Sequence, residues 1–406
     1  MSNVSSSSVI RMAASLRLET PWHHDEDSAS SNETTDQQIT VSFSTPAAEE
    51  RFTAVDSSSL FQLPFYIYDN ELDWSVNATF IHSGLNRVEL LHQSAYLNFK
   101  HSDDYWLLQH AKQHPMRTLD TSKAKLFLVP TLLSAWKVGY KGGHNKNKFC
   151  AHKGICNMQL LHRAEQLLQE SKWYQRSQGR DHIVVDSHWR KHWDKLSYSH
   201  LLNCNTISFE HRIPTIGKPK QYQTPRVHIP SFYIGRPCSH HTNKTKDFAM
   251  IATLKPNSKL FQDRSHICDW LHEGQKHQNY TVALCGRGNQ CPALGEARFG
   301  FHARGDTWGS NRLIDTLLSG AIPLITSPQQ IQILPDFVPW EEVTYQVDVA
   351  SAAAFDASLQ SILQKPEQEL EEKLTNISKH LDIFNHKKGR QFDLYMHRFA
   401  QLLELY

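Results

Sequence analysis

The sequence lacks any run of 18 or more consecutive apolar residues, so no segment is predicted to cross a bilayer as a helix. The first residues also lack the apolar core of a signal peptide. The formal charge is only +2, and no concentrated basic stripe points to nucleic acid or a membrane surface. Because these classes are not indicated, we expect a globular protein, and 406 residues are enough for two ordinary domains.

Metal-ligand patterns are also scarce, although the chain has 25 His residues. The pairs His23-His24 and His240-His241 have no Cys or carboxylate at a recognisable ligand spacing. None of the seven Cys stands in a Cys-x-x-Cys zinc pattern, and no Asp-x-Asp motif follows a predicted strand. We therefore expect no metal site.

The seven Cys residues leave the redox state of the protein open. Cys150 and Cys156 lie six residues apart, and so do Cys285 and Cys291, so each pair has a spacing that permits a short disulfide loop. Buried or free thiols explain these four residues equally well. The glycosylation sequons favour a secretory-pathway lumen, because chance gives about two or three N-x-S/T triplets in such a composition. The chain has sequons at Asn3, Asn32, Asn77, Asn243, Asn279 and Asn376.

The first half of the chain reads as a polar leader followed by alternating strands and helices. Residues 1–55 are rich in Ser, Thr, Asp, Glu and Gln, which predicts disorder. The helix-then-strand order that follows is typical of an open, parallel α/β sheet. The predicted strands are Phe61–Asp69, Lys123–Pro130 and Gly179–Trp189, and the predicted helices are Val88–Leu97, Tyr105–His114 and Met158–Tyr174.

A stretch rich in Pro, Lys and His, from Ile213 to about Lys246, resembles a linker to a second α/β layer. Beyond it, a helix over Lys259–Gly274 is expected to stop at its glycine. Two such Rossmann-like layers predict a two-domain, nucleotide-binding enzyme, because ligands bind beyond the carboxyl ends of parallel strands. The predicted strands are Asp247–Thr253, Tyr280–Cys285, Arg298–His302 and Ala321–Thr326.

The stretch RGDTWGSNRLIDTLLSGAIPLIT, residues 304–326, predicts a glycine-punctuated loop and a capped helix. Ser310 stands at the N-cap of a helix over Asn311–Ser319, and Gly320 follows its end. The free N–H groups and positive dipole of a helix start bind anions. The sequence therefore predicts a phosphate site at this helix start.

Two charged residues of the helix fit such a site. Arg312 lies in the first turn, where a guanidinium can bind phosphate oxygens in a bidentate manner. Asp315 shares its face of the helix and can accept hydrogen bonds from ribose hydroxyls. An ordinary solvated Arg–Asp surface pair is the alternative interpretation.

The stretch resembles the nucleotide-sugar-binding segment of the exostosin family of glycosyltransferases. Similar segments occur in the family's order from residue 65 to residue 347, so the resemblance does not depend on one motif. The segments are FYIYDNEL, MRTLDTSKAKLFLVP, WYQRSQGRDHIVVDSHW, TKDFAMIATLKPNSKLFQDR and ILPDFVPWEEVTYQV.

The resemblance implies a GT-B fold, with two Rossmann-like domains facing across a nucleotide-sugar cleft. Residues 56–230 would form the acceptor-side domain, residues 231–385 the nucleotide-sugar-binding domain, and residues 386–406 a helix that packs back. It also implies an inverting enzyme that moves a sugar from a UDP-sugar to a polysaccharide or glycoprotein glycan in the Golgi lumen, in association with the membrane. The implied partners are the donor, a glycan acceptor and a second glycosyltransferase chain, with no nucleic acid and no cofactor beyond the co-substrate.

An inverting transfer needs positive charge for the leaving diphosphate and a base for the acceptor hydroxyl. For the base we predict Asp186 or His188, at the end of an acceptor-side strand, and then Asp69. The predicted nucleotide-binding residues are Arg264, Arg304, Gly305, Gly309, Ser310, Arg312 and Asp315.

Two departures from the family pattern keep other functions open. The family usually has Glu at the position of Asp315, and Asp at the position of Trp189. A glycan- or nucleotide-binding partner subunit without turnover is therefore an alternative. A different nucleotide-dependent transferase of similar architecture is another.

Overall fold

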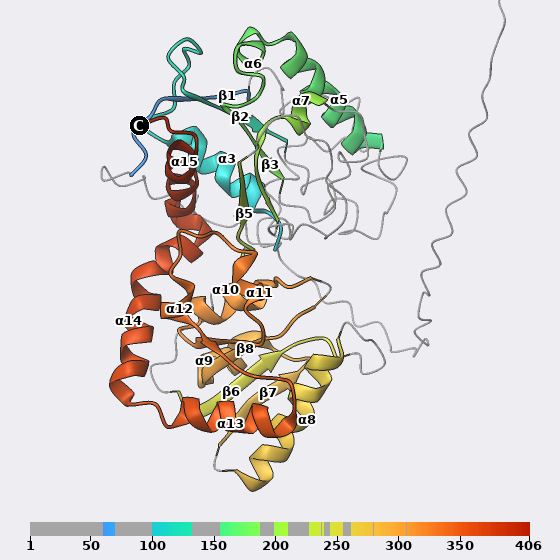
Figure 1. Cartoon of the computed structure of the whole chain (residues 1–406), viewed down its shortest axis with the longest axis vertical. Helices are drawn as coiled ribbons and strands as arrows, with labels where there is room; N and C mark the ends of the chain where they lie inside the picture. Colours follow the sequence, from blue (N-terminus) through green and yellow to red (C-terminus); the bar gives the residue numbers. More distant parts are fainter. Residues whose placement is uncertain are drawn as a thin grey trace, which may run out of the picture. The chain divides into compact units, whose positions relative to one another are not determined.

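The structure is a computed structural model of the whole chain (Figure 1). It describes residues 60–69, 100–131, 155–186, 199–209, 227–236, 238, 244–254, 261–278, 280–305 and 307–406, with the side chains of 155–161, 186 and 209 left out. The predicted leader and the predicted helix Val88–Leu97 lie outside these residues. Residues 52–406 form one compact unit, and the domain boundaries predicted within it stay predictions.

The first sheet has five parallel strands, which lie side by side in sequence order. All five residues of its second strand are buried, because the apolar run LFLVP is covered on both faces. The three strands predicted in the first half are confirmed, with shorter bounds. The strands are β1 (Phe65–Ile67), β2 (Leu126–Pro130), β3 (His182–Asp186), β4 (Asn205–Phe209) and β5 (His228–Ser231).

Two predictions about the first half are wrong in detail. The helix expected over Met158–Tyr174 is divided at Ser171, whose extended backbone and side-chain hydrogen bond to the N–H of Tyr174 start a new helix. The linker expected from residue 213 contains β5, which completes the first sheet. The helices of this half are α3 (Asp103–Gln113), α5 (Ile155–Glu170), α6 (Lys172–Ser177) and α7 (Ser199–Leu202).

The second sheet is also parallel, but its strand order is β10-β9-β8-β6-β7. After β6 the chain adds β7 on one side, and it then returns to add β8 on the other side of β6. The strand order therefore reverses between β6 and β8. The strands are β6 (Lys246–Ile251), β7 (Val282–Gly286), β8 (Ala297–His302), β9 (Ile322–Ile325) and β10 (Tyr345–Gln346).

Helices flank this sheet, with α8 and α13 next to each other at its lower edge in Figure 1. Trp270 of α8 packs on Phe355 of α13, with ring centroids 5.3 Å apart. Together with the first sheet, this arrangement confirms the predicted α/β fold of two parallel layers. The helices are α8 (Gln262–His277), α9 (Gln290–Glu296), α10 (Asn311–Leu318), α11 (Gln329–Gln332), α12 (Trp340–Val343) and α13 (Ala352–Leu363).

The helix expected to stop at Gly274 instead runs on to His277. A Cβ atom at this position would lie 1.7 Å from the hydroxyl oxygen of Tyr280. The glycine therefore permits the close approach of a buried tyrosine and does not end the helix.

The disulfides differ from the pairing that sequence spacing allowed. Cys285 of β7 pairs with Cys268 of α8, which packs on that strand, at a Cα separation of 5.5 Å. Cys291 of α9 pairs with Cys238, at a Cα separation of 5.0 Å. The Cys285–Cys291 loop that the spacing permits is therefore not formed, because packing between elements brings other sulfur atoms within bonding range. The other permitted loop, Cys150–Cys156, involves side chains outside the described part of the chain.

The chain ends with α14 (Glu367–Phe384) and α15 (Arg390–Leu402), the second of which confirms the predicted terminal helix. α15 lies against α3 (Figure 1), and the carboxylate of Asp393 accepts hydrogen bonds from the backbone N–H groups of Leu60 and Phe61. None of the helices within the described ranges is both long and apolar enough to cross a membrane.

Candidate functional site

A pocket of about 350 Å³ opens at the carboxyl ends of β6 and β8, where the strand order of the second sheet reverses. Ile251, the last residue of β6, lines it together with Ala252 and Thr253, which follow the strand. Phe261 and Arg264, at the start of α8, form another part of the wall. A reversal of this kind leaves a crevice between the connections above and below the sheet, which is where parallel α/β proteins bind ligands.

The start of α10 faces this pocket, as its sequence predicts. Ser310 caps the helix, and its side-chain oxygen accepts the backbone N–H of Arg312 at 3.2 Å. Gly320 follows the helix with a φ of 64°, which favours glycine. Ser310, Asn311 and Arg312 all line the pocket, so the positive end of the helix dipole points toward it.

A second guanidinium, that of Arg264 from α8, reaches the pocket beside the loop between β8 and α10. A Cβ atom at Gly305 would lie 2.6 Å from Nη2 of Arg264, so the glycine makes room for this side chain. Arg264 in turn donates to the carbonyl oxygens of Ala303 and Thr253, which follow β8 and β6. Gly309 also lines the pocket. The structure thus brings together Arg264, Gly305 and Gly309, three of the predicted residues.

Arg304, another predicted residue, packs on an aromatic ring of its own loop. Its guanidinium lies over the ring of Trp308, 4.2 Å from the ring centroid, which is a cation–π geometry. It is not among the residues that line the pocket.

Asp315 lies beneath the pocket with no solvent-exposed surface. Its carboxylate accepts hydrogen bonds from the backbone N–H of Arg236 (2.8 Å), from Asn311 Nδ2 (2.7 Å) and from Arg312 Nη1 (2.8 Å). Burial raises the pKa of Asp315, and these contacts oppose the shift. The same Nη1 atom also donates to Oε1 of Gln290. Asp315 therefore contacts residues that face the pocket and does not itself line it; its contact with a ribose stays a prediction.

The opposite wall comes from residues that the sequence did not reveal, namely Lys100, His101 and Tyr233. The hydroxyl of Tyr233 donates to the carbonyl oxygen of Gly309 at 3.2 Å, and its ring lies 5.3 Å from that of His101. Tyr233 follows β5, so a correct assignment of that strand would have placed it at a sheet's carboxyl edge. No carboxylate is among the described residues that line the pocket.

The three predicted bases stand in different situations. Asp69 is held by Arg117, which donates to both carboxylate oxygens at 3.1 Å, and by Lys112 at 3.6 Å. Asp186 ends β3 at the carboxyl edge of the first sheet, but only its backbone is described. His188 lies outside the described residues. Their catalytic roles stay predictions.

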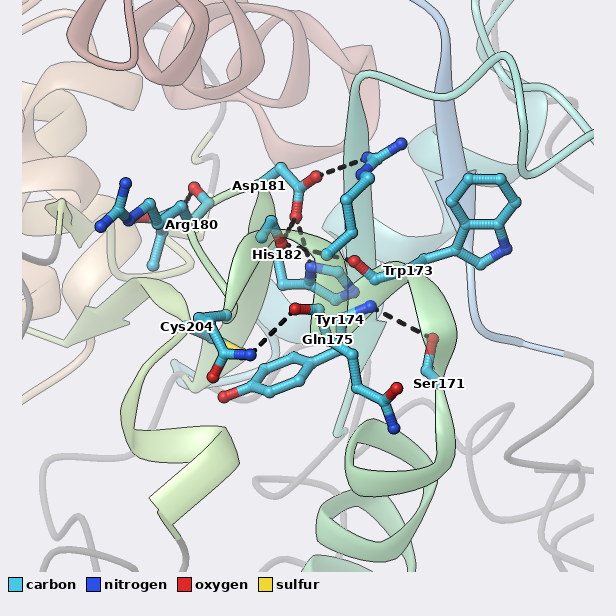
Figure 2. A network of polar contacts seen from close by, with 12 residues as sticks. Ser171, Trp173, Tyr174, Gln175, Arg180, Asp181, His182 and Cys204 are labelled. Atoms are coloured by element: carbon cyan, nitrogen blue, oxygen red, sulfur yellow. Dashed lines mark hydrogen bonds and ion pairs between the residues drawn. The ribbon is translucent and has the colours of Figure 1, made fainter.

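A second polar network lies on the first sheet (Figure 2). Asp181 accepts from Nδ1 of His182 at 2.6 Å and from Arg176 at 2.8 Å. The other ring nitrogen of His182 lies 3.1 Å from the hydroxyl of Tyr68, which in turn contacts Ser171 at 2.8 Å. None of these residues lines the pocket. The network instead joins β1 and β3 to the start of α6, which is a structural role.

One of the comparisons with known proteins identifies a family. The model of the Exostosin GT47 domain matches residues 55–365. No match was found among the curated proteins.

Three solved structures illustrate the likeness to known folds. A glycosyltransferase of Rickettsia africae is 10% identical, with 85% of this chain and 100% of that chain covered and a TM-score of 0.38. A variant of S. aureus TarM, solved with UDP, is 11% identical over 59% of each chain, with a TM-score of 0.36. The sucrose-phosphate synthase of Thermosynechococcus elongatus is 10% identical over 77% and 80% of the two chains, with a TM-score of 0.29. The chain spans about three-fifths of the TarM chains that it matches.

Proposed function

The chain belongs to the exostosin GT47 family of glycosyltransferases, and on this premise we propose that it moves a sugar from a UDP-sugar to a glycan hydroxyl with inversion at the anomeric carbon. The observation that carries the proposal is the pocket at the strand reversal of the second sheet, into which the capped start of α10 points. Arg264 and Arg312 line the same pocket. Together these groups supply the positive charge that a leaving nucleoside diphosphate requires.

The residues have distinct tasks in this proposal. The backbone N–H groups at Ser310 and Asn311 and the guanidinium of Arg312 bind the diphosphate and stabilise the charge that develops when the glycosidic bond breaks. Arg264 stands across the loop from them and neutralises the second phosphate. Because the lining residues within the described ranges supply cations and no carboxylate, we propose that transfer does not depend on a metal ion.

We propose three candidates for the base that accepts the proton of the acceptor hydroxyl, namely His101, Asp186 and His188. His101 lines the pocket, and imidazole is the side chain that most often serves as a general base. Asp186 and His188 follow β3 at the carboxyl edge of the first sheet. A loss of kcat of about 100-fold or more in one of His101→Ala, Asp186→Asn and His188→Ala, with unchanged UDP affinity, would identify the base.

The cellular setting is proposed from the family. We propose a polysaccharide or glycoprotein glycan as acceptor, the Golgi lumen as the compartment, and a dimer with itself or with another glycosyltransferase as the assembly. The two disulfides of the described residues fit an oxidising compartment.

The proposal is tested by binding first and by turnover second. Calorimetric titration with UDP, GDP, ADP and CDP should give binding of UDP in preference to the others, and binding should persist in EDTA. Transfer is then measured as UDP release from a panel of UDP-sugars with glycan acceptors, and the product's anomeric configuration is read by NMR. A chain that binds none of the four nucleotides would contradict the proposal.

A second function is favoured by one observation. Both oxygens of Asp315 are engaged inside the protein, and no carboxylate lines the described pocket. A nucleotide-binding partner subunit without turnover would bind UDP in the titration and release none from any UDP-sugar.

A further inference from the structure

Two residues, Asp315 and Gln290, hold the guanidinium of Arg312 through one of its nitrogen atoms. Its Nη1 atom donates to Asp315 on its own helix and to Oε1 of Gln290, the first residue of α9. Its side chain is 31% exposed and lines the pocket, whereas Asp315 is fully buried. A guanidinium is a rigid fork, so contacts on one edge fix the direction in which its other N–H groups point.

One disulfide connects the groups that surround this arginine. Cys291 follows Gln290 directly in α9, and its partner Cys238 lies two residues after Arg236. The backbone N–H of Arg236 donates to the other oxygen of Asp315. The bridge therefore ties the segment that satisfies Asp315 to the helix that supplies Gln290.

The same segment is fitted closely to α10. A Cβ atom at Gly235 would lie 2.6 Å from Cγ2 of Ile314 and 3.1 Å from the backbone carbonyl carbon of that residue. Tyr233 donates to Gly309 at the pocket wall. The disulfide thus closes a ring of contacts around the start of α10. Because α9 has only seven residues, it depends on tertiary contacts such as this bridge to keep Gln290 in place.

We propose that Gln290 and the Cys238–Cys291 disulfide are positioning elements for the nucleotide diphosphate. They hold the guanidinium of Arg312 in the direction that the phosphates require, and they make donor binding depend on an oxidised bridge. The proposal rests on the proposed function, because it presumes that Arg312 binds the diphosphate of a nucleotide.

The first experiment compares UDP with uridine, which lacks the phosphates. Calorimetric titration should show that Gln290→Ala weakens UDP binding by about tenfold, because a charge-assisted contact that orients Arg312 is lost. Uridine binding should not change. In an Arg312→Ala background the same substitution should have no further effect on UDP, since the arginine that Gln290 positions is absent.

The second experiment uses the other disulfide as a matched control. Replacing Cys238 and Cys291 by Ser should weaken UDP binding in the same direction as Gln290→Ala, again with no added effect when Arg312 is Ala. Replacing Cys268 and Cys285 by Ser removes a bridge between α8 and β7, two elements that carry neither Arg312, Asp315 nor Gln290. That control should leave the ratio of UDP to uridine affinity unchanged.

The outcomes separate the two proposals. A wild-type chain that does not bind UDP contradicts the proposed function. A wild-type chain that binds UDP, with Gln290→Ala and the Cys238/Cys291 variant both unchanged, overturns the positioning role alone. An equal loss of UDP and uridine affinity in the Cys238/Cys291 variant would show a general stabilising bridge and would also overturn it. Circular dichroism spectra confirm that each variant is folded before it is titrated.

Discussion

The two parallel sheets have five described strands each, and the pocket opens at the strand reversal of the second sheet, with Tyr233 after β5 of the first sheet in its wall. In the first sheet the strands follow one another in sequence order, so consecutive connections run along the sheet in one direction. In the second sheet the order reverses at β6, and the connections to β7 and β8 diverge. The comparison shows that strand composition does not distinguish the two layers, whereas strand order does.

The same contrast holds for one carboxylate network on each sheet. Asp181 pairs with Arg176 and Asp315 pairs with Arg312, both at 2.8 Å. Arg176 lies over the ring of Trp173, 5.1 Å from its centroid, whereas Arg312 lines the pocket. Two ion pairs of similar geometry thus differ in what the guanidinium faces. This difference predicts that Arg312 binds a ligand and that Arg176 stabilises the fold.

The largest expected effect separates the two arginines. Arg312→Ala should weaken UDP binding by about 100-fold, because two charge-assisted phosphate contacts are lost. Arg176→Ala, the matched control, should leave UDP affinity unchanged. Titration calorimetry measures both. Equal UDP affinities of the two variants would remove the functional distinction between the networks.

The next effect belongs to the first network. Asp181→Ala should lower the free energy of unfolding by about 2 kcal/mol, because buried His182 and its neighbours lose their acceptor. Asp120→Ala, which removes an exposed carboxylate, should change it much less. Urea unfolding measures both, and UDP affinity should be the same in the two variants. A loss of UDP affinity with Asp181→Ala would contradict a purely structural network.

The pH dependence of stability compares a buried histidine from each sheet. Burial lowers the pKa of His302 to about 4, opposed by the backbone of Trp308 and assisted by Arg264. Burial also lowers the pKa of His182, although Asp181 opposes the shift. Both histidines stay neutral in the folded chain while the unfolded chain takes up protons below about pH 6.5, so this stability is present above that pH and is lost as the pH falls.

From pH 6.5 to 5.5, His302 should cost the folded state about 1 kcal/mol. Urea unfolding of His302→Gln should therefore show a flatter pH dependence than the wild type. His182→Gln should flatten it less, because Asp181 partly offsets the burial. An identical pH slope in the wild type and His302→Gln would be inconsistent with this account.

The smallest expected effect tests the glycine loop. Gly305→Ala places a methyl group against Nη2 of Arg264, which is the flexible end of a side chain. The guanidinium should move, and UDP affinity should fall by about threefold with little change in stability. Gly288→Ala is the matched control, because its Cβ would lie at the same 2.6 Å from a leucine side chain away from the pocket. Equal UDP affinities of the two variants would argue against a role for Arg264.

Much of the second sheet's site could be predicted from sequence because its signals are local. Ser310, the helix of eight residues and Gly320 all lie within eleven positions, and each has a known preference in a capped helix. The same holds for the apolar run Leu126–Pro130.

The misjudged features depend on contacts between distant residues. The sequence predicts that Gly274 ends a helix, but in the fold this glycine accommodates Tyr280 within the helix. Ser171 divides another mispredicted helix, although the apolar pattern continues through it. The partners of Cys285 and Cys291 are chosen by packing of α8 and α9. Tyr233 reaches Gly309 from 76 residues away, so its contact with that loop does not follow from any local pattern in the sequence.

The docking of α15 constrains the order in which the protein folds. Asp393 binds the N–H groups of Leu60 and Phe61 across 333 and 332 residues of chain. Tyr395 donates to the carbonyl oxygen of Pro230 and accepts from the N–H of Phe232, next to β5. The layer made first at the ribosome therefore receives this helix only after all the described strands of the second sheet have been synthesised. Until then its apolar surface stays uncovered, and a nascent chain of this protein should depend on chaperones longer than its early, regular strand order suggests.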